Sequence, residues 1–440
     1  MKPLPQRKDT ASVFGMGRSG RALVAHLVAE GVRTYAFDDR DESLLGDLPL
    51  WLSSLGVPLF AGTAHEARGQ FVFRTPAMRP DHPALCRAAL RGAVVMGEAE
   101  YFSLLCPAPI LAVTGSDGKT TTATMMAGLL SEMGHRVYLG GNIGRSLLPF
   151  LSEMTAADFC VLELSSFQTM DMTCPFHTGV VTNLSPNHLN WHKSMAEYTE
   201  AKHRLLTLSE RRVLRCGLFP EERGLRFSLS GAGDFTLRGD TLCGYGIPLC
   251  PKSEVRAAGV HNIENLLAAA AATAPFVSPF AVRRFASRFS GVPHRQEQVG
   301  EKEGVRYINS SIDTTPTRTA ATLAALGNEG RVLLLLGGRG KGLSSLPLRD
   351  ALRGREAVCF LFGEMGEEFS HALTGAGVPY YRCDTMREAF FAAVARARAG
   401  DAVLLSPAAT AYDAFVDFEA RGEAFRALVR EYTEENKEKE

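Results

Sequence analysis

The sequence lacks the features that mark several broad classes of protein. It has no excess of either charge, since Lys and Arg together number 48 and Asp and Glu together also number 48. This balance supplies no net field for nucleic acid or an anionic membrane, so an anionic ligand needs a local site. Apolar runs such as 332–336 and 402–405 are much shorter than the roughly 20 residues that span a bilayer. The first dozen residues hold no apolar segment typical of secretion, which predicts a cytoplasmic protein.

Cysteine is present but has no recognisable pattern. The nine cysteines are odd in number and scattered, without CxxC or Cys/His spacing. This predicts neither a disulfide framework nor a zinc site, and we expect buried thiols in a reducing compartment. Because no Ser-His-Asp or Cys-His arrangement is legible, a hydrolase with a covalent intermediate is disfavoured.

Apolar strands and helical segments alternate along the chain, a pattern typical of α/β domains with parallel sheets. At about 150 residues per domain, 440 residues suggest two to four domains. The expected strands are 12–14, 32–37, 110–113, 179–181, 305–309, 332–336, 357–362 and 402–405, and the expected helices are 21–31, 124–132, 262–274, 317–326 and 387–399. Prolines near residues 105 and 293 divide the chain into blocks 1–104, 105–292 and 293–440. The last ten residues are expected to form a solvated charged tail.

The segment 113–122, VTGSDGKTTT, carries the sharpest signal. It follows an apolar strand and precedes a helical run, where a glycine-rich turn aims backbone N–H groups at phosphate. Lys119 supplies a positive charge for the β- and γ-phosphates, and the Thr120 hydroxyl suits Mg²⁺. The GxxxxGK[ST] spacing is not matched, because only two residues separate Gly115 from Gly118, and a plain turn stays the alternative. We predict that this segment binds ATP or GTP.

A second glycine-rich turn, GMGRSG, begins at Gly15. Its glycines fit GxGxxG, and Asp38 ends the next expected strand, where a dinucleotide fold places its ribose-binding acid. The turn alone suggests NAD, but a turn without ligand, or one that holds another nucleotide's diphosphate, stays open. We predict an α/β protein of three domains: Rossmann-like at the N-terminus, a central P-loop mononucleotide-binding domain, and Rossmann-like at the C-terminus.

Four further positions are candidates of lower specificity. Glu163 ends an apolar strand, as does the acid that holds Mg²⁺ in P-loop proteins. His188 lies in the loop TNLSPNHLNWH, although a single loop histidine is more often structural than a ligand. Lys202, taken alone, is an ordinary lysine on a helix surface. The segment 336–342, LGGRGKG, suits an anion at the carboxyl end of a strand.

Taken together, these segments resemble the Mur ligases over nearly the whole chain. The resemblance rests on TGSDGKTTT, GGNIGRSL, VLELSSFQ, NHLNWH followed by EYTEAK, GVHNIENLLAA, GVPHRQE, LLLGGRGKG and LLSPAATAYDAF. ELSSFQ favours the members that add D-glutamate. The resemblance implies a monomeric ATP-dependent ligase that adds D-glutamate to UDP-N-acetylmuramoyl-L-alanine through an acyl phosphate, in peptidoglycan precursor synthesis. Three alternatives stay open: another amide ligase, such as one for a different Mur step or a folylpolyglutamate synthetase; an NAD-dependent dehydrogenase; and a non-catalytic relative.

The resemblance also implies a role for each matched position. The ATP site consists of Gly115, Ser116, Asp117, Gly118, Lys119, Thr120, Thr121, Asn262, Asn265 and Arg295. Two Mg²⁺ ions are held, the first by Thr120 and Glu163 and the second by His188 and a carbamylated Lys202. The UDP-sugar site consists of Gly15, Gly17, Arg18, Ser19, Asp38, Arg40, Thr75, Asn142, Ser165 and Gln168. The D-glutamate site consists of Thr314, Lys341, Tyr412 and Phe418, and the catalytic residues are Lys119, His188 and Lys202.

Three segments depart from the family pattern. Asp117 stands where the phosphate loop usually has Asn, and the common DHLD reads NHLN at 187–190. The NDSKAT of many members is NSSIDT at 309–314, so an acid and a lysine are replaced by Ser310 and Ile312. This weakens the D-glutamate assignment, because Lys341 or Arg318 has to replace the missing cation.

Overall fold

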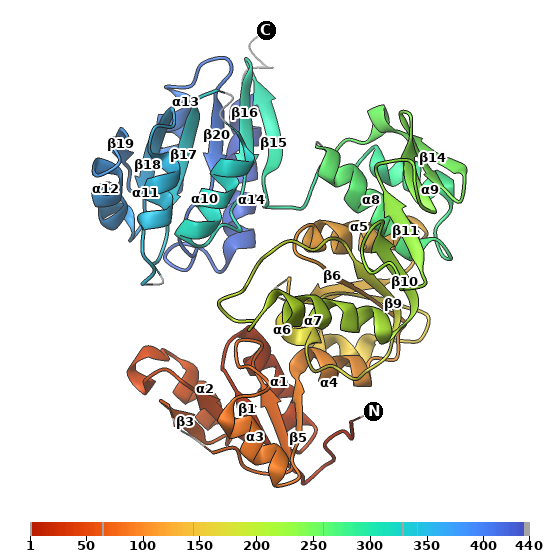
Figure 1. Ribbon diagram of the computed structural model, residues 1–440. Helices are drawn as coiled ribbons and strands as arrows, with labels where there is room; N and C mark the ends of the chain where they lie inside the picture. The colour runs from red at the N-terminus through yellow and green to blue at the C-terminus, as the bar shows by residue number, and fades with distance from the viewer. Residues whose placement is uncertain are drawn as a thin grey trace. The chain divides into compact units, whose positions relative to one another are not determined.

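The computed structural model describes residues 2–63, 66–143, 145–257, 259–327, 330–340 and 342–434. Within these residues the strands form three sheets, of five, nine and six strands, each accompanied by helices (Figure 1). The first two sheets belong to one compact unit, Met1–Phe289, and the third belongs to a second unit, Ser290–Glu440. The predicted α/β class is therefore confirmed, with a separate sheet in each of the three predicted blocks.

The first sheet has the strand order β3-β2-β1-β4-β5, and all neighbouring strands are parallel. Its elements are β1 (Thr10–Phe14), α1 (Arg18–Ala29), β2 (Arg33–Asp38), η1 (Glu42–Leu44), α2 (Leu48–Ser54), β3 (Leu59–Ala61), β4 (Phe71–Arg74), α3 (Pro83–Leu90), β5 (Val94–Gly97) and α4 (Glu98–Leu105). Apolar residues of α1, α2 and α4 pack on one face, and those of α3 pack on the other. The strand order reverses between β1 and β4, which is where open α/β sheets bind ligands.

The central sheet has the order β14-β13-β12-β11-β10-β9-β6-β8-β7 and is parallel from β7 to β12. Its elements are β6 (Ile110–Thr114), α5 (Lys119–Glu132), β7 (Val137–Gly141), η2 (Leu148–Glu153), β8 (Phe159–Glu163), α6 (Ser166–Thr169), β9 (Phe176–Val181), α7 (Met195–Thr207), β10 (Ser209–Arg215), β11 (Leu225–Ser228), β12 (Phe235–Arg238), β13 (Thr241–Gly244), β14 (Ile247–Pro251), η3 (Lys252–Glu254), α8 (Val260–Thr273) and α9 (Pro279–Ala286). The Ala-rich helix α8 packs closely against α5, because small side chains permit a close approach. This packing brings the start of α8 near the start of α5.

The third sheet has the order β15-β16-β20-β17-β18-β19, and only the β15–β16 pair is antiparallel. Its elements are β15 (Glu297–Lys302), β16 (Val305–Asn309), α10 (Pro316–Ala325), β17 (Val332–Gly337), α11 (Leu346–Leu352), β18 (Ala357–Phe362), α12 (Gly366–Thr374), β19 (Tyr380–Arg382), α13 (Met386–Val394), β20 (Ala402–Leu405) and α14 (Phe418–Glu434). Alternate side chains of β17 enter two different apolar clusters, as the period of two along a strand requires. The sheet is therefore covered by helices on both faces.

The predicted solvated tail is wrong for its first four residues, 431–434, which continue helix α14. Tyr432 explains the difference, since its ring packs against Tyr307 at 6.0 Å and Phe390 at 6.3 Å between centroids. Aromatic contacts of this kind stabilise the last helical turn. Residues 435–440 lie outside the described part of the chain.

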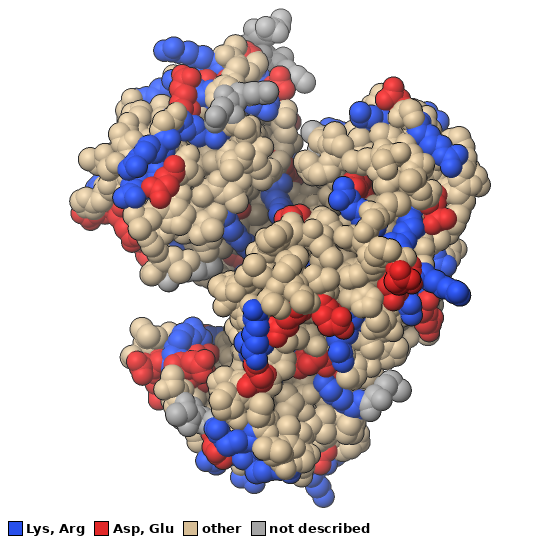
Figure 2. Space-filling model, viewed as in Figure 1, with Lys and Arg blue, Asp and Glu red and all other residues tan. Residues whose placement is uncertain are grey.

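All nine cysteines are free thiols, and five of them are buried. The prediction that all are buried is wrong for Cys86, which is exposed on α3. On the face drawn in Figure 2, basic and acidic side chains are interspersed, as the balanced composition leads one to expect. Among the described helices, none combines the length and apolar character needed to cross a membrane.

Candidate active site

The glycine-rich turn between β6 and α5 has a backbone that requires glycine at two positions. Gly115 has φ +153° and Gly118 has φ +76°, values that other residues rarely adopt. A Cβ atom at Gly115 would lie 1.8 Å from Thr182 Oγ1, and one at Gly118 would lie 2.4 Å from Asn265 Oδ1. The turn is therefore packed against the end of β9 and the start of α8. It leads directly into the N-terminus of α5, the end of a helix whose dipole favours anions.

Residues after β9 fix the conformation of this turn. Asn183 Oδ1 accepts the Asp117 N–H at 2.8 Å, and Asn183 Nδ2 donates to the Asp117 carbonyl at 3.1 Å. The Ser116 hydroxyl lies 2.8 Å from the Tyr198 hydroxyl. Tyr198 was not predicted as a site residue, although it precedes Lys202 by four residues and therefore shares its face of α7. That spacing within EYTEAK is the signal that points to it.

Two lysines lie beside the turn. Lys119 Nζ donates to the Gly115 and Ser116 carbonyls at 3.0 and 2.8 Å, and Lys202 Nζ donates to the Gly115 carbonyl at 2.6 Å. Lys202 is 2% exposed, so it is not an ordinary surface lysine. Its Nζ lies 4.6 Å from the Tyr198 ring centroid. Burial, reinforced by the positive charge of Lys119, lowers the pKa of Lys202 to about 7.

The carboxylate of Glu163 faces the same turn from the end of β8. It is 3% exposed, with Oε2 accepting the Thr120 hydroxyl at 2.7 Å and Oε1 accepting Asn142 Nδ2 at 2.8 Å. The structure thus brings together Thr120, Glu163 and Asn142, which lie on three segments. Within the described residues no group of three or more His, Cys, Asp and Glu side chains is placed to hold a metal ion. A metal ion here would therefore be held by few protein oxygens and by phosphate, as is typical of Mg²⁺.

His188 occupies the loop between β9 and α7, with a backbone φ of +54°. Its ring contacts the Phe167 ring at 5.0 Å between centroids. Burial lowers the pKa of His188, and the charges of Lys119 and Lys202 lower it further. The imidazole is therefore neutral at pH 7, the form that binds metal ions.

The ELSSFQ segment has a clear local role. The Ser165 hydroxyl accepts the Gln168 N–H at 3.3 Å, and Gln168 Oε1 accepts the Ser165 N–H at 2.9 Å. This capping box begins the short helix α6. Gln168 also lines a narrow crevice with Ser19, so two residues predicted to contact the UDP-sugar lie together.

The N-terminal turn is organised by Asp38. This carboxylate accepts the Met16 N–H at 2.9 Å and also pairs with Arg40, at 2.8 Å from Nε and 2.9 Å from Nη2. Burial alone would raise the pKa of Asp38, but the hydrogen bonds from Arg40 and Met16 outweigh it and lower that pKa. Because both carboxylate oxygens are engaged, Asp38 orients Arg40 and has little capacity left for ribose hydroxyls. Thr75 lies against Gly15, whose Cβ would be 2.8 Å from Thr75 Cβ.

Among the other predicted ligands of these sites, Asn265 is buried against Gly118, and Asn262 lies one turn earlier on α8. Thr121 lies in the first turn of α5. Gly17 is the N-cap of α1, which begins at Arg18.

In the second unit, the predicted D-glutamate residues Thr314 and Tyr412 lie in the segments after β16 and β20, and Phe418 begins α14. The Ser311 hydroxyl donates to the Phe418 carbonyl at 2.8 Å, which joins segment 309–314 to α14. Arg318 Nη1 donates to the Ile312 carbonyl at 3.2 Å. Thr314 is half-buried, whereas Tyr412 and Arg295 are exposed. Lys341 lies outside the described residues.

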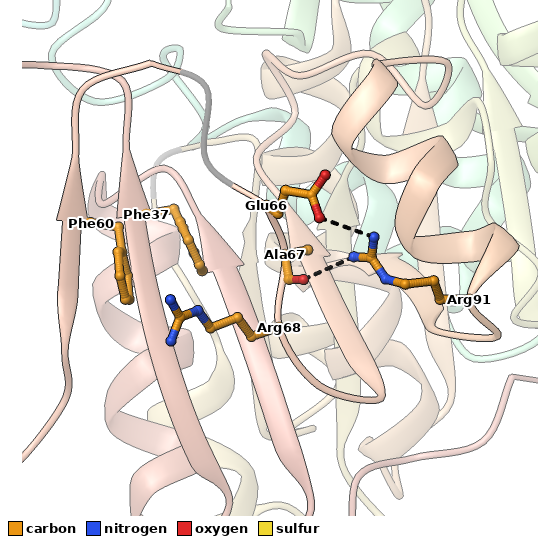
Figure 3. A pocket seen from close by; sticks show the side chains of 6 residues that line it. All are labelled: Phe37, Phe60, Glu66, Ala67, Arg68 and Arg91. Atoms are coloured by element: carbon orange, nitrogen blue, oxygen red, sulfur yellow. Dashed lines mark hydrogen bonds and ion pairs between the residues drawn. The ribbon is translucent and has the colours of Figure 1, made fainter.

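A pocket of about 380 Å³ lies elsewhere in the N-terminal sheet and contains none of the predicted site residues (Figure 3). Its residues are Phe37, Phe60, Glu66, Ala67, Arg68 and Arg91. Arg91 donates to the Ala67 carbonyl at 3.0 Å and pairs with Glu66 at 3.3 Å, while Arg68 lies 4.6 Å from the Phe60 ring centroid. The two arginines are thus occupied by contacts within the sheet.

Comparison with known proteins agrees with this geometry. Residues 113–214 match the family model of the Mur ligase middle domain, and residues 294–409 match that of the Mur ligase, glutamate ligase domain. A UDP-N-acetylmuramoylalanine–D-glutamate ligase of Ruminiclostridium cellulolyticum is 37% identical over 96% of this chain and 97% of its own length. One from Clostridium novyi is 38% identical with the same coverage.

Solved structures share the fold. The UDP-N-acetylmuramate–alanine ligase MurC of Thermotoga maritima has a TM-score of 0.54 and 20% identity, covering 97% of this chain and 99% of its own. A pseudomurein peptide ligase type C of Methanothermus fervidus has a TM-score of 0.50 and 16% identity, covering 97% and 100%. With relatives above 30% identity along nearly its whole length, the chain belongs to the Mur ligase family.

Proposed function

We propose that the chain is an ATP-dependent ligase that joins D-glutamate to the L-alanyl carboxyl group of UDP-N-acetylmuramoyl-L-alanine, in peptidoglycan precursor synthesis. The observation that carries this proposal is the convergence of Lys119, Lys202, Thr120 and Glu163 on the turn before α5. Relatives named for this reaction match nearly the whole chain. We assign UDP-sugar binding to 1–104, ATP binding to 105–292 and amino-acid binding to 293–440, in a cytoplasmic monomer.

The chemistry must make a carboxylate reactive towards an amine. An oxygen of the L-alanyl carboxylate attacks the γ-phosphorus of ATP, the bond to ADP breaks, and an acyl phosphate forms. The amine of D-glutamate then attacks the carbonyl carbon, loses a proton, and phosphate leaves with the bonding electrons. Lys119 exchanges its two carbonyl partners for phosphate oxygens and stabilises the negative charge that develops during transfer.

The residues present fit a first Mg²⁺ ion. The Thr120 hydroxyl and the Glu163 carboxylate are 2.7 Å apart, and Mg²⁺ prefers such oxygens together with phosphate. Mg²⁺ neutralises charge on the β- and γ-phosphates when it is bound. Thr120 and Glu163 orient the triphosphate by holding that charge at the start of α5.

A second Mg²⁺ ion fits His188 and Lys202 only if Lys202 is modified, because an ammonium group cannot bind a cation. With a pKa of about 7, a large share of Lys202 is neutral amine at physiological pH. A neutral amine adds to CO₂ and loses a proton, which gives an anionic carbamate. The burial of Lys202 beside Gly115 supports a role for that carbamate close to the triphosphate.

Two arginines support the assignment of the UDP-sugar and D-glutamate sites. Arg40, oriented by Asp38, is suited to a diphosphate or uracil oxygen near the GMGRSG turn. In the second unit, Arg318 lies at the Ile312 carbonyl, and we assign it the role of the cation for a D-glutamate carboxylate, alongside Thr314, Tyr412, Phe418 and Lys341.

The test is ATP-dependent phosphate release with UDP-N-acetylmuramoyl-L-alanine and a panel of D- and L-amino acids. We expect release with D-glutamate and little with L-glutamate or diamino acids. A strong preference for L-glutamate or a diamino acid would refute the substrate, and absence of release with every amino acid would refute the ligase activity.

A further inference from the structure

Arg79 lies in the segment after β4, yet its guanidinium reaches the loop between β9 and α7. Nη1 donates to the Trp191 carbonyl at 2.6 Å, and the guanidinium carbon lies 4.9 Å from the Trp191 ring centroid. Arg79 also pairs with Glu197 through Nη2 at 2.8 Å and with Asp81 through Nε at 3.0 Å. One side chain thus holds a carbonyl, an indole ring and two carboxylates.

These contacts are well suited to arginine in particular. The Arg79 side chain is 19% exposed and that of Glu197 is 22% exposed, so water screens the pair only in part. Hydrogen bonds from Arg79 lower the pKa of Glu197 to about 2. The planar fork of a guanidinium can meet two carboxylates and a ring at once, whereas an ammonium group cannot.

A second set of contacts joins the same two segments. Trp191 Nε1 donates to the Ala77 carbonyl at 2.8 Å, and Lys193 Nζ pairs with Asp81 at 2.5 Å. Segment 75–81 of the N-terminal sheet is thereby fixed to residues 191–197. At its other end, Thr75 packs against Gly15 of the GMGRSG turn.

The loop that Arg79 holds carries residues of the candidate active site. The Trp191 and His192 N–H groups donate to the His188 carbonyl at 3.0 and 2.9 Å, so the backbone of His188 is tied to that of Trp191. The Phe167 ring contacts both Trp191 and His188. Glu197 lies in the first turn of α7, the helix that carries Lys202.

We propose that Arg79 is a positioning residue of the ligase, which clamps the His188 loop and the start of α7 to the segment beside the UDP-sugar turn. The inference rests on the proposed function, since that function makes His188 and Lys202 part of the active site. It adds a residue that acts through Trp191 and Glu197. The clamp makes the geometry of His188 dependent on the N-terminal sheet.

The first test compares Arg79→Ala with Arg136→Ala in steady-state kinetics. Arg136 is a matched control, because it pairs with Glu153 at 2.8 Å and lies 5.0 Å from the Tyr138 ring centroid, outside the clamp. We expect Arg79→Ala to lower kcat by about tenfold or more and to raise the Mg²⁺ concentration at half-saturation, with little change in KM for ATP. Arg79→Lys should restore little of the loss, and Arg136→Ala should match the parent. Equal kcat and Mg²⁺ dependence in Arg79→Ala and the parent would overturn the inference.

A second test measures the solvent exposure of Trp191, in the loop between β9 and α7, and does not require enzyme turnover. The chain has two tryptophans, so Trp51→Phe leaves Trp191 as the only one. In that background we expect Arg79→Ala to increase acrylamide quenching of Trp191 fluorescence, and Arg136→Ala to leave it unchanged. If Arg79→Ala does not fold, Glu197→Gln replaces it in this test, because glutamine retains the shape of the side chain. We expect Glu197→Gln to increase the quenching of Trp191 fluorescence as well. Unchanged quenching would overturn the inference even if ligase activity is present, whereas a parent without D-glutamate-dependent turnover would instead overturn the proposed function.

Discussion

The two glycine-rich turns of the first unit follow equivalent strands but gather different side chains. The turn after β1 faces one buried carboxylate, Asp38, which is saturated by Arg40 and a backbone N–H. The turn after β6 faces two lysines and the Glu163–Thr120 pair. A glycine pattern of this kind predicts a backbone suited to bind an anion. The side chains that other segments contribute then determine which anion binds and which reaction can take place.

The largest expected effect is that of Lys119→Ala. Loss of its charge at the β- and γ-phosphates should reduce turnover by about 10²–10³-fold or more. Binding of the UDP-sugar, measured by calorimetry, should stay unchanged because it depends on the other turn. Turnover near the parent rate would show that the turn after β6 is misassigned.

Lys202→Ala should be nearly inactive as well, but for a different reason. In the proposed mechanism the carbamate of Lys202 supplies the anion of the second metal site, so small carboxylic acids added to the assay should restore part of the activity. Because the pKa of Lys202 is lowered to about 7, parent activity should rise with pH through 7 in the presence of bicarbonate. Glu200→Ala, an exposed position on the same helix, serves as the control. Full activity in Lys202→Ala would show that Lys202 has only a structural role.

Arg40→Ala addresses the other turn. Removing the proposed charge-assisted contact to the UDP-sugar should raise KM for that substrate by about tenfold, with KM for ATP unchanged. Arg87→Ala, whose pair with Glu66 is exposed, is the matched control. An equal rise in both KM values would contradict the assignment of the UDP-sugar to the turn after β1 and of ATP to the turn after β6.

The smallest expected effect concerns stability at low pH. The pKa of Glu197 is lowered to about 2, so its ion pair with Arg79 contributes stability above the unfolded-state value near 4.5 and loses it as pH falls towards 2. The urea midpoint should fall over this interval, and Glu197→Gln should fall less steeply. Parallel curves for the two proteins would show that the pair contributes nothing measurable.

Much of the architecture could be predicted because its signals are local. The strands Val305–Asn309, Ala357–Phe362 and Ala402–Leu405 have the predicted bounds. The last two, AVCFLF and AVLL, are continuous apolar runs, as is typical of strands buried on both faces. The turn after β6 was likewise predicted from a strand, two glycines and a helix. Strand β10 was missed because it carries several polar residues, SERRVLR, and β11, β12 and β13 were missed because they have only four residues each.

The long-range contacts of the site could not be predicted. Lys202 looks like a surface residue in a polar helix, and only the packing of α7 against β6 and β9 buries it. Arg79 and Glu197 are 118 positions apart, so their pairing depends on how two sheets share one compact unit. Local sequence patterns therefore indicate which ligand a turn binds, whereas the side chains that surround the turn come from distant segments of the chain.

The most direct test of the account is an equilibrium titration of the protein with a non-hydrolysable ATP analogue in excess Mg²⁺. The account predicts saturable binding at a single site, which Lys119→Ala weakens strongly and Arg40→Ala leaves intact. Absence of nucleotide binding by the parent protein under these conditions would contradict it.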